Sequence, residues 1–220
     1  MTRAMNPILG PQISLEEMQK HKWRYRMPGL VLMLARILLL VSIFLPYWYM
    51  ELEAPQYPGG LHVTAYVNHL TGDVAEIDSL NHYIGMRPLE EAAVLERTLG
   101  VWMIIAMVLL VESAARIRTK WAALLLMPAI FFPAVFLIDL HLWLSYFGQN
   151  LDPTAPLSSS IKPFTPPVLG VGVVGQFRTV ASAGEGWWLA VTGGVLMIVA
   201  LFFHRRAYKP LHDQAKETAA

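Results

Sequence analysis

Three histidines and a methionine in one polar stretch of the chain have side chains that could ligate a metal ion. His62, His69, His82 and Met86 supply imidazole and thioether groups, the ligand types that suit copper. Their spacing matches no metal-binding motif, and a histidine in a polar segment often serves a structural role through hydrogen bonds. The thioether of Met86 is equally suited to filling a gap in a core. A copper site and a structural role are therefore both open.

A second pair of candidates lies inside an apolar stretch, in the sequence FLIDLHLW. Asp139 and His141 are ionisable, and an ionisable residue at membrane depth is a functional candidate by default because leaving it unpaired is costly. The two residues are two positions apart, however, so on a helix they do not face the same side. Each could instead pair separately with a neighbouring polar loop, and both alternatives remain open.

Several chemistries are excluded or disfavoured by what the sequence lacks. The absence of cysteine excludes thiolate metal sites, c-type haem, cysteine-ligated iron–sulfur clusters and disulfides. No phosphate-binding glycine loop, nucleophile with its base or metalloprotease histidine pair occurs. A formal net charge of +1 without a strongly basic patch argues against nucleic acid as a partner. The sequence therefore predicts a protein that is not an enzyme, with copper as the only cofactor it suggests.

Four long apolar segments must position these side chains. The chain is 55% hydrophobic and only 15% charged, and residues 28–50, 98–115, 121–147 and 184–204 are each close to the roughly 20 residues that a helix needs to cross a membrane. The first segment has no convincing signal-peptide cleavage site. We therefore predict an all-α integral membrane protein of four transmembrane helices spanning residues 28–204, with membrane lipid as a partner.

The basic residues predict which ends of these helices are cytoplasmic. They precede the first helix, fill the turn between the second and third, and follow the fourth: Arg3, Lys20, Lys22, Arg24, Arg26, Arg116, Arg118, Lys120, Arg205, Arg206 and Lys209. Because cytoplasmic segments are enriched in Lys and Arg, the basic segment 1–27 and the tail 205–220 are predicted to be cytoplasmic. The loops 51–97 and 148–183 then lie outside a bacterial-type cytoplasmic (inner) membrane that the chain crosses several times.

Aromatic residues and a few polar or small residues refine this arrangement. Aromatic side chains prefer the membrane interface and cluster near the predicted outer ends of the helices: Tyr47, Trp48, Tyr49, Trp143, Tyr146, Trp187 and Trp188. Glu112 is four residues before Arg116, which predicts an ion pair, and Arg36 is expected to reach the cytoplasmic interface. Gly193 and Gly194 would permit close helix packing.

The first outer loop has the pattern of a small folded cap. Apolar and polar residues alternate over 61–67, which predicts a half-buried strand with His62 on the polar side. Asp78 is expected to begin a short helix that Gly85 ends, with His82 and Met86 on one side of it. Pro88 is expected to open a helical extension of the second membrane helix. The second outer loop has five prolines and predicts an extended, semi-rigid strap.

The cap also has the composition of a docking surface. Its carboxylates make it acidic, and rigid aromatic side chains around them are typical anchors for a protein partner. The residues expected to bind a partner are Tyr57, Tyr66, Asp78, Asn81, His82 and Tyr83. The partner should present a basic or mixed polar face.

Three stretches carry a resemblance to a known group of proteins. The sequences PYWYMELEAPQYPGGLHVTAYV, GDVAEIDSLNHYIGMRPLEEAAVLER and LDPTAPLSSSIKPFTPP resemble small, uncharacterised multi-helix membrane proteins associated with gene clusters for nitrous oxide respiration. The resemblance covers the outer loops and their helix junctions, about half of the chain. It implies an accessory role near a copper enzyme outside the cytoplasmic membrane.

Two functions follow as expectations. The first is a non-catalytic accessory or assembly protein whose cap docks an extracytoplasmic respiratory enzyme, with copper as its metal, or the maturation partners of that enzyme. The second is a small structural subunit of a respiratory or photosynthetic membrane complex, interacting through its helices and its cap with other membrane or extracytoplasmic proteins of an electron-transfer complex. Without an inverted repeat, four helices make a poor stand-alone transport pathway.

Overall fold

The computed structural model describes residues 9–10 and 15–217 and divides into two compact units. The helical unit consists of residues up to 41 together with 103–132 and 189 onwards, and the sheet unit consists of residues 42–102 and 133–188. Arg3, which contributed to the orientation argument, and residues 218–220 of the predicted tail lie outside the described residues.

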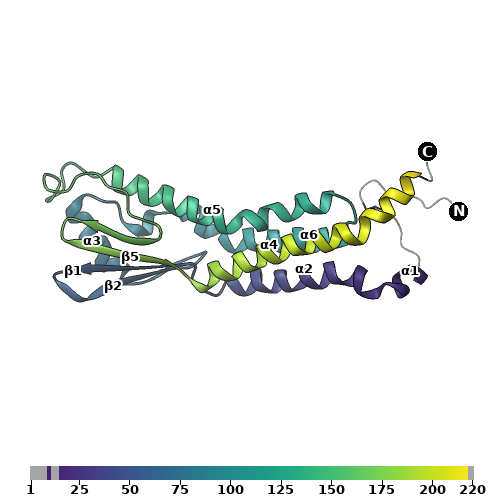
Figure 1. The fold of residues 1–220 in the computed structure, drawn as a ribbon. Helices are drawn as coiled ribbons and strands as arrows, with labels where there is room; N and C mark the ends of the chain where they lie inside the picture. Colours follow the sequence, from purple (N-terminus) through teal and green to yellow (C-terminus); the bar gives the residue numbers. More distant parts are fainter. Residues whose placement is uncertain (1–8, 11–14, 218–220) are drawn as a thin grey trace. The chain divides into compact units, whose positions relative to one another are not determined.

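Among the described residues, four helices are long and apolar enough to cross a membrane. They are α2 (Lys22–Ser42), α4 (Val94–Arg116), α5 (Trp121–Gln149) and α6 (Glu185–Glu217), and a short helix α1 (Leu15–Lys20) precedes them (Figure 1). The predicted number of membrane helices is thereby confirmed. Helix α6 continues beyond the predicted end at 204, so most of the predicted tail is helical.

Helix α2 ends earlier than predicted, because the apolar run that begins in the helix continues into a strand. Pro46 restricts the residue before it to an extended conformation, which favours a helix end upstream. The side chain of Tyr47 is fully buried, with its hydroxyl 2.7 Å from the hydroxyl of Ser42, and Trp48 is 4% exposed. These two aromatic side chains therefore pack in a core rather than on an exposed surface, and their position near the outer membrane interface stays a prediction.

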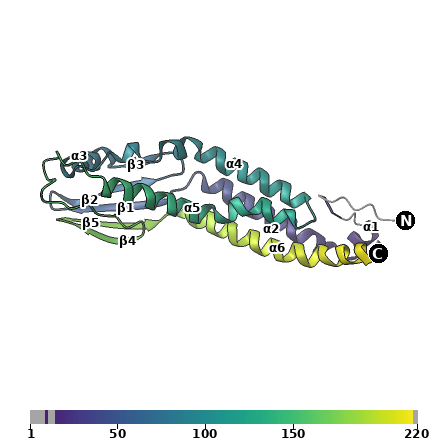
Figure 2. The ribbon, with the colours of Figure 1, turned by 90° about the horizontal axis from the view of Figure 1, so that it is seen from above.

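In the helical unit, α2 and the described parts of α4, α5 and α6 run side by side in both views (Figures 1 and 2). Gly193 and Gly194 are buried in α6. A Cβ atom on Gly193 would lie 3.4 Å from the carbonyl oxygen of Ala35 in α2, and one on Gly194 would lie 3.4 Å from that of Ile130 in α5. The two glycines therefore permit the close helix packing that the sequence predicted.

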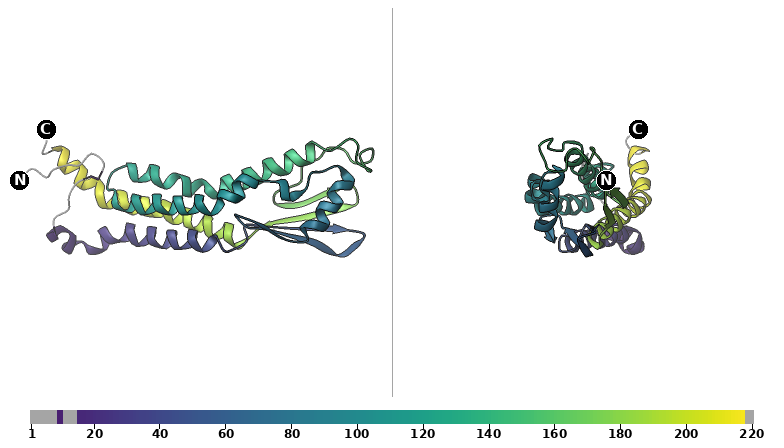
Figure 3. Two further views of the ribbon diagram at one scale, coloured as in Figure 1. Left: turned by 180° about the vertical axis from the view of Figure 1, so that it is seen from behind. Right: turned by 90° about the vertical axis from the view of Figure 1, so that its left-hand side faces the viewer.

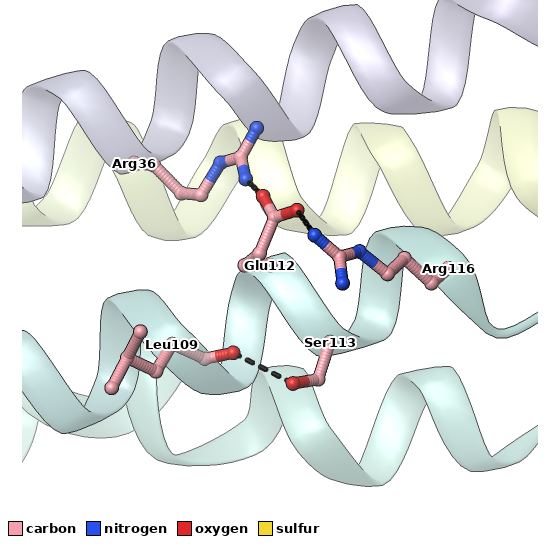
Figure 4. Close-up of polar contacts among 5 residues, drawn as sticks. All are labelled: Arg36, Leu109, Glu112, Ser113 and Arg116. Carbon is pink, nitrogen blue, oxygen red and sulfur yellow. Dashed lines mark hydrogen bonds and ion pairs between the residues drawn. The ribbon is translucent and has the colours of Figure 1, made fainter.

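An ion-pair cluster links α2 and α4 within the helical unit (Figure 4). One carboxylate oxygen of Glu112 accepts a hydrogen bond of 2.8 Å from Arg116, as the sequence predicted, and the other oxygen pairs with Arg36. The Arg36 side chain is 19% exposed. The Arg36 and Glu112 charges, which lie within apolar helices, are therefore paired with each other, which lowers the cost of placing them there.

The sheet unit contains five antiparallel strands, so the chain is not all-α as predicted. Strands β1 (Trp48–Ala54), β2 (Tyr57–Ala65) and β3 (Leu70–Gly72) come from the first loop, and β4 (Gly170–Val174) and β5 (Phe177–Ala183) come from the second. The order across the sheet is β3-β2-β1-β5-β4. The prediction of an extended strap fits only residues 161–167, because residues 153–160 form successive turns and the end of that loop forms the β4–β5 hairpin.

One face of the sheet, the inner face, is covered by helices of the same unit (Figure 3). The predicted alternation is confirmed, with Leu61 and Val63 buried and His62 exposed between them. Leu61 and Val63 pack with Ile77 of α3 (Val74–Ile84). Further along the sheet, β1, β2 and β5 pack against Leu144 of α5. Burial of these apolar side chains is the main source of stability for the sheet unit.

Helix α3 begins after an aspartate and ends at a glycine. The end was predicted correctly, but the start was not. It follows Asp73, whose carboxylate accepts a 2.8 Å hydrogen bond from the His62 backbone, rather than starting at Asp78. It ends as predicted at Gly85, which has a left-handed φ of 80° that glycine adopts without strain.

The segment between α3 and α4 also differs from the prediction. Pro88 precedes only a short 3₁₀ turn, η1 (Leu89–Glu91), and Ala93 then has a positive φ of 51°. The continuous helix expected from Pro88 is therefore wrong, because the backbone turns at Ala93 before α4 begins.

Candidate functional site

The uncovered side of the sheet, which we call the outer sheet face, combines charged and apolar side chains. Residues directly opposite each other in neighbouring strands point to the same face. The pairings therefore define two rows across the sheet, one of His62, Glu51, Val180 and Val171, and one of Glu53, Arg178 and Val173. Arg178 donates a 2.5 Å hydrogen bond to Glu53 in the second row. The face thus changes from charged on β1 to apolar on β4.

Strand β4 forms one edge of this sheet (Figure 2), and it exposes apolar side chains. Val171 is 55% exposed and Val173 is 70% exposed, and Leu169 just before the strand is also exposed. In an edge strand, the backbone N–H and C=O groups that point away from the sheet are available to pair with another chain. The sequence analysis missed this edge, because glycines alternate with the valines and weaken the strand pattern.

A cleft of ≈ 390 Å³ lies where the β1–β2 turn meets the start of β5. Tyr57, one of the residues expected to bind a partner, lines it together with Glu51, Glu53 and Arg178. The ion pair of the outer sheet face therefore borders this cleft, whereas the Tyr57 side chain also packs against the inner-face cluster that contains Leu52 and Leu61.

Tyr49 lies on the same face of β1 as Glu51 and Glu53. It forms a hydrogen bond that links β1 to the start of α6. Its hydroxyl donates to the Glu185 carboxylate at 2.6 Å. This bond to a negative group is the main reason why the pKa of Tyr49 is raised to about 12.

The residues that the sequence assigned to partner binding on α3 divide between surface and interior. His82 and Tyr83 are exposed and lie edge to face, with ring centres 6.2 Å apart. Asp78 accepts a 2.6 Å hydrogen bond from the backbone N–H of Leu89, so it holds η1 against α3. Asn81 is 6% exposed and belongs to the interior. His82 and Tyr83 are therefore the members of this set that α3 presents to solvent.

Tyr66, the remaining residue of the predicted partner set, lies in the turn between β2 and β3. Its ring is stacked on that of His69, with centroids 4.4 Å apart and planes 5° apart. Nδ1 of His69 is 2.7 Å from the side-chain oxygen of Asn68. These contacts fix the shape of the turn.

The predicted metal ligands occupy different surroundings. His62 is on the outer sheet face, His69 is stacked in the β2–β3 turn, and His82 is exposed at the end of α3. Met86 is 8% exposed and packs in a cluster with Ile84 and Phe147, so it does not share a surface with His82 as predicted. Within residues 9–10 and 15–217, no three His, Cys, Asp or Glu side chains come together as a metal-binding group. Copper binding stays a prediction.

The polar pair on α5 is separated, as its spacing predicted. Asp139 is half-buried and close enough to Glu96 of α4 for the two carboxylates to interact electrostatically. His141 is exposed, with its Nε2 3.5 Å from the Ser145 hydroxyl. A carboxylate oxygen of Glu96 is buried and accepts no hydrogen bond from the part of the chain that is described. Glu96 could not be identified from the sequence pattern, because this contact joins two different helices.

A small apolar cavity lies between the inner face of the sheet and α3. Its volume is ≈ 60 Å³, and its walls are apolar except for Asn81 and Thr179. The side-chain nitrogen of Asn81 has no hydrogen-bond acceptor among the described residues. An amide donor in an apolar wall can donate to one acceptor atom inside the cavity, and without such an atom its burial is costly.

The comparisons with known proteins assign this arrangement to no family. No protein-family model matches the chain. No curated protein sequence is significantly similar to it.

Proposed function

We propose that the protein is a non-catalytic membrane accessory or assembly protein, and that its outer sheet face docks another protein. The observation that supports this proposal best is the exposed edge strand β4. Val171 and Val173 are exposed on it, next to the Glu53–Arg178 ion pair. A contiguous exposed apolar strip rimmed by charged residues is typical of an interaction surface.

The physical basis of docking at β4 is strand addition. An extended segment of the partner would form main-chain hydrogen bonds with the open edge, and its side chains would cover the two valines. Fully burying a valine stabilises an association by about 1.5–3 kcal/mol before entropic costs. The charged side chains of Glu51, Glu53 and Arg178 would then select the partner and its orientation, because charge complementarity contributes more to specificity than to affinity.

The class of partner is part of the proposal and is supported by the resemblance of the loop sequences. It is an extracytoplasmic respiratory enzyme that contains copper, or a protein that matures it. The location outside the cytoplasmic membrane is supported by the basic residues, which flank the membrane helices mostly within the helical unit.

The docking proposal is tested by placing charge on the β4 edge. A Val171→Lys/Val173→Lys variant should lose the partner that copurifies with the wild type after mild detergent extraction, because lysine at an edge opposes strand pairing. Both valines are exposed, so the core is left intact. The matched control is Leu157→Lys, an exposed apolar residue on the 151–169 segment, and it should retain the partner.

Retention of the partner by the double-lysine variant would contradict docking at β4. It would favour the alternative function, a structural subunit held in a respiratory or photosynthetic complex through its membrane helices. Tyr83→Ala changes the exposed end of α3 and leaves β4 intact. It therefore tests whether α3 contributes to partner binding separately from β4.

The proposed orientation has its own test. The chain has no cysteine, so single cysteines can be introduced without background. Cysteines at Ser79 and Ser159 in the sheet unit should react with a membrane-impermeant thiol reagent in intact cells, whereas one at Lys120 should react only after permeabilisation. All three positions are exposed. The opposite labelling pattern would put the outer sheet face on the cytoplasmic side.

A further inference from the structure

A pocket in the helical unit has a basic rim and an apolar wall. It lies between the turn that joins α4 to α5 and the C-terminal part of α6, and its volume is ≈ 600 Å³. Arg118 and Lys120 line it from the turn, and Arg205 and Lys209 line it from α6. One carboxylate, that of Asp213, also lines it. Among the described residues that line it, four cations against one anion give this basic pocket a net charge of +3.

The apolar wall of the basic pocket is formed by residues that continue into membrane-length helices. Ala123 of α5 and Leu201 of α6 contribute to it, and Trp121 is the first residue of α5. Tryptophan at the end of a membrane helix is typical of the lipid headgroup level. The pocket therefore places apolar surface and positive charge where an amphiphile has its acyl chains and its headgroup.

Contacts within the helical unit hold the walls of the pocket in place. Nε2 of His204 in α6 donates a 2.9 Å hydrogen bond to the carbonyl oxygen of Ile117 in the turn. The ring of Tyr208 packs on that of His204, with centroids 4.7 Å apart. Because these contacts fix the two walls relative to each other, a ligand would have little ordering cost to overcome.

We propose that the basic pocket binds the phosphate group of an anionic phospholipid. The guanidinium group of Arg205 can form paired hydrogen bonds with phosphate oxygens, the guanidinium group of Arg118 adds positive charge while it also contacts Tyr208, and the two ammonium groups add point charges. A free phosphate ion offers the same anionic chemistry but leaves the apolar wall unused, so a lipid fits the pocket better. This site is independent of the docking function and lies in the other unit of the chain.

The test uses the intact purified protein and measures retained lipid by native mass spectrometry. Phosphatidylglycerol should be retained in preference to zwitterionic phosphatidylcholine of the same chain length. An Arg205→Gln/Lys209→Gln variant should bind phosphatidylglycerol about 30-fold more weakly, because each basic residue near an anionic headgroup contributes a roughly five-fold factor. The control, Arg87→Gln/Lys162→Gln, removes two exposed charges of the sheet unit and should bind like the wild type.

Three outcomes would overturn the proposal. The first is equal retention of the two lipids by the wild type, and the second is undiminished binding of phosphatidylglycerol by the α6 variant. The third is binding of inorganic phosphate to the wild type as strong as that of phosphatidylglycerol, which would indicate a free-anion site. If the α6 variant does not fold, Lys120→Gln in the turn takes its place, with an expected loss of about five-fold. Binding by the wild type should also weaken as salt is raised.

Discussion

Replacing Ile77 by alanine should loosen the sheet unit by a predictable amount. Ile77 is 2% exposed and packs with Leu61 and Val63 beneath α3. The change removes three buried carbons, which cost about 2.4 kcal/mol at about 0.8 kcal/mol each, and the cavity left behind places the total between about 2 and 5 kcal/mol.

Hydrogen exchange of the α3 amides in detergent or nanodiscs measures this loss directly. Exchange through local opening should become about 30-fold to 4,000-fold faster, because each 1.4 kcal/mol corresponds to about a tenfold change. Leu157→Ala removes the same number of carbons from a residue that is 41% exposed, so it should have a much smaller effect. Wild-type exchange rates in α3 of the Ile77→Ala variant would refute the assignment of Ile77 to the core of this unit.

Two further predictions concern charges. Arg36→Met should lower the free energy of unfolding, measured by titration with SDS, by about 1.5–3 kcal/mol, because the Glu112 carboxylate loses one charged hydrogen-bond partner. Adding Glu112→Leu to this variant should restore most of the lost stability. A further loss of stability in the double variant would contradict the pairing. The raised pKa of Tyr49 means that the stability it contributes is full below pH 10 and is lost as pH rises through about 12. Glu185→Gln should therefore return the pKa of Tyr49 toward 10 in a phenolate absorbance titration, and an unchanged titration would argue against the bond.

The membrane helices could be predicted from the sequence because their signal is local. A run of about 20 apolar residues is sufficient to indicate a spanning helix, whatever its neighbours are. The same signal explains the error at 43–50, where the apolar run of α2 continues through Tyr47 and Trp48 into β1. Their burial in a sheet core depends on partners such as Ala65 and Ala181, which a local pattern does not show.

The sheet and the candidate site were harder to predict, because they depend on pairing between distant segments. Two of the three inner positions of β4 are Gly170 and Gly172, which have no side chains to create an apolar alternation, and Val174 is the third. Polar and aromatic residues on α3 were identified from composition, but composition does not tell which of them face inward. Asn81 and His82 are adjacent in the sequence, yet one lines a cavity and the other is exposed.

The position of β1 between β2 and β5 has a consequence for biosynthesis. β1 pairs with β2 soon after both are made, but Trp48 pairs with Ala183 about 135 residues later in the chain. At about 5–20 residues per second, the second edge of β1 stays unpaired for roughly 7 to 27 s while α3 and the two membrane-length helices α4 and α5 are synthesised. A ribosome that stalls after α5 would therefore leave a half-built sheet with an open edge, and quality-control proteases could recognise that edge as the mark of an unfinished chain.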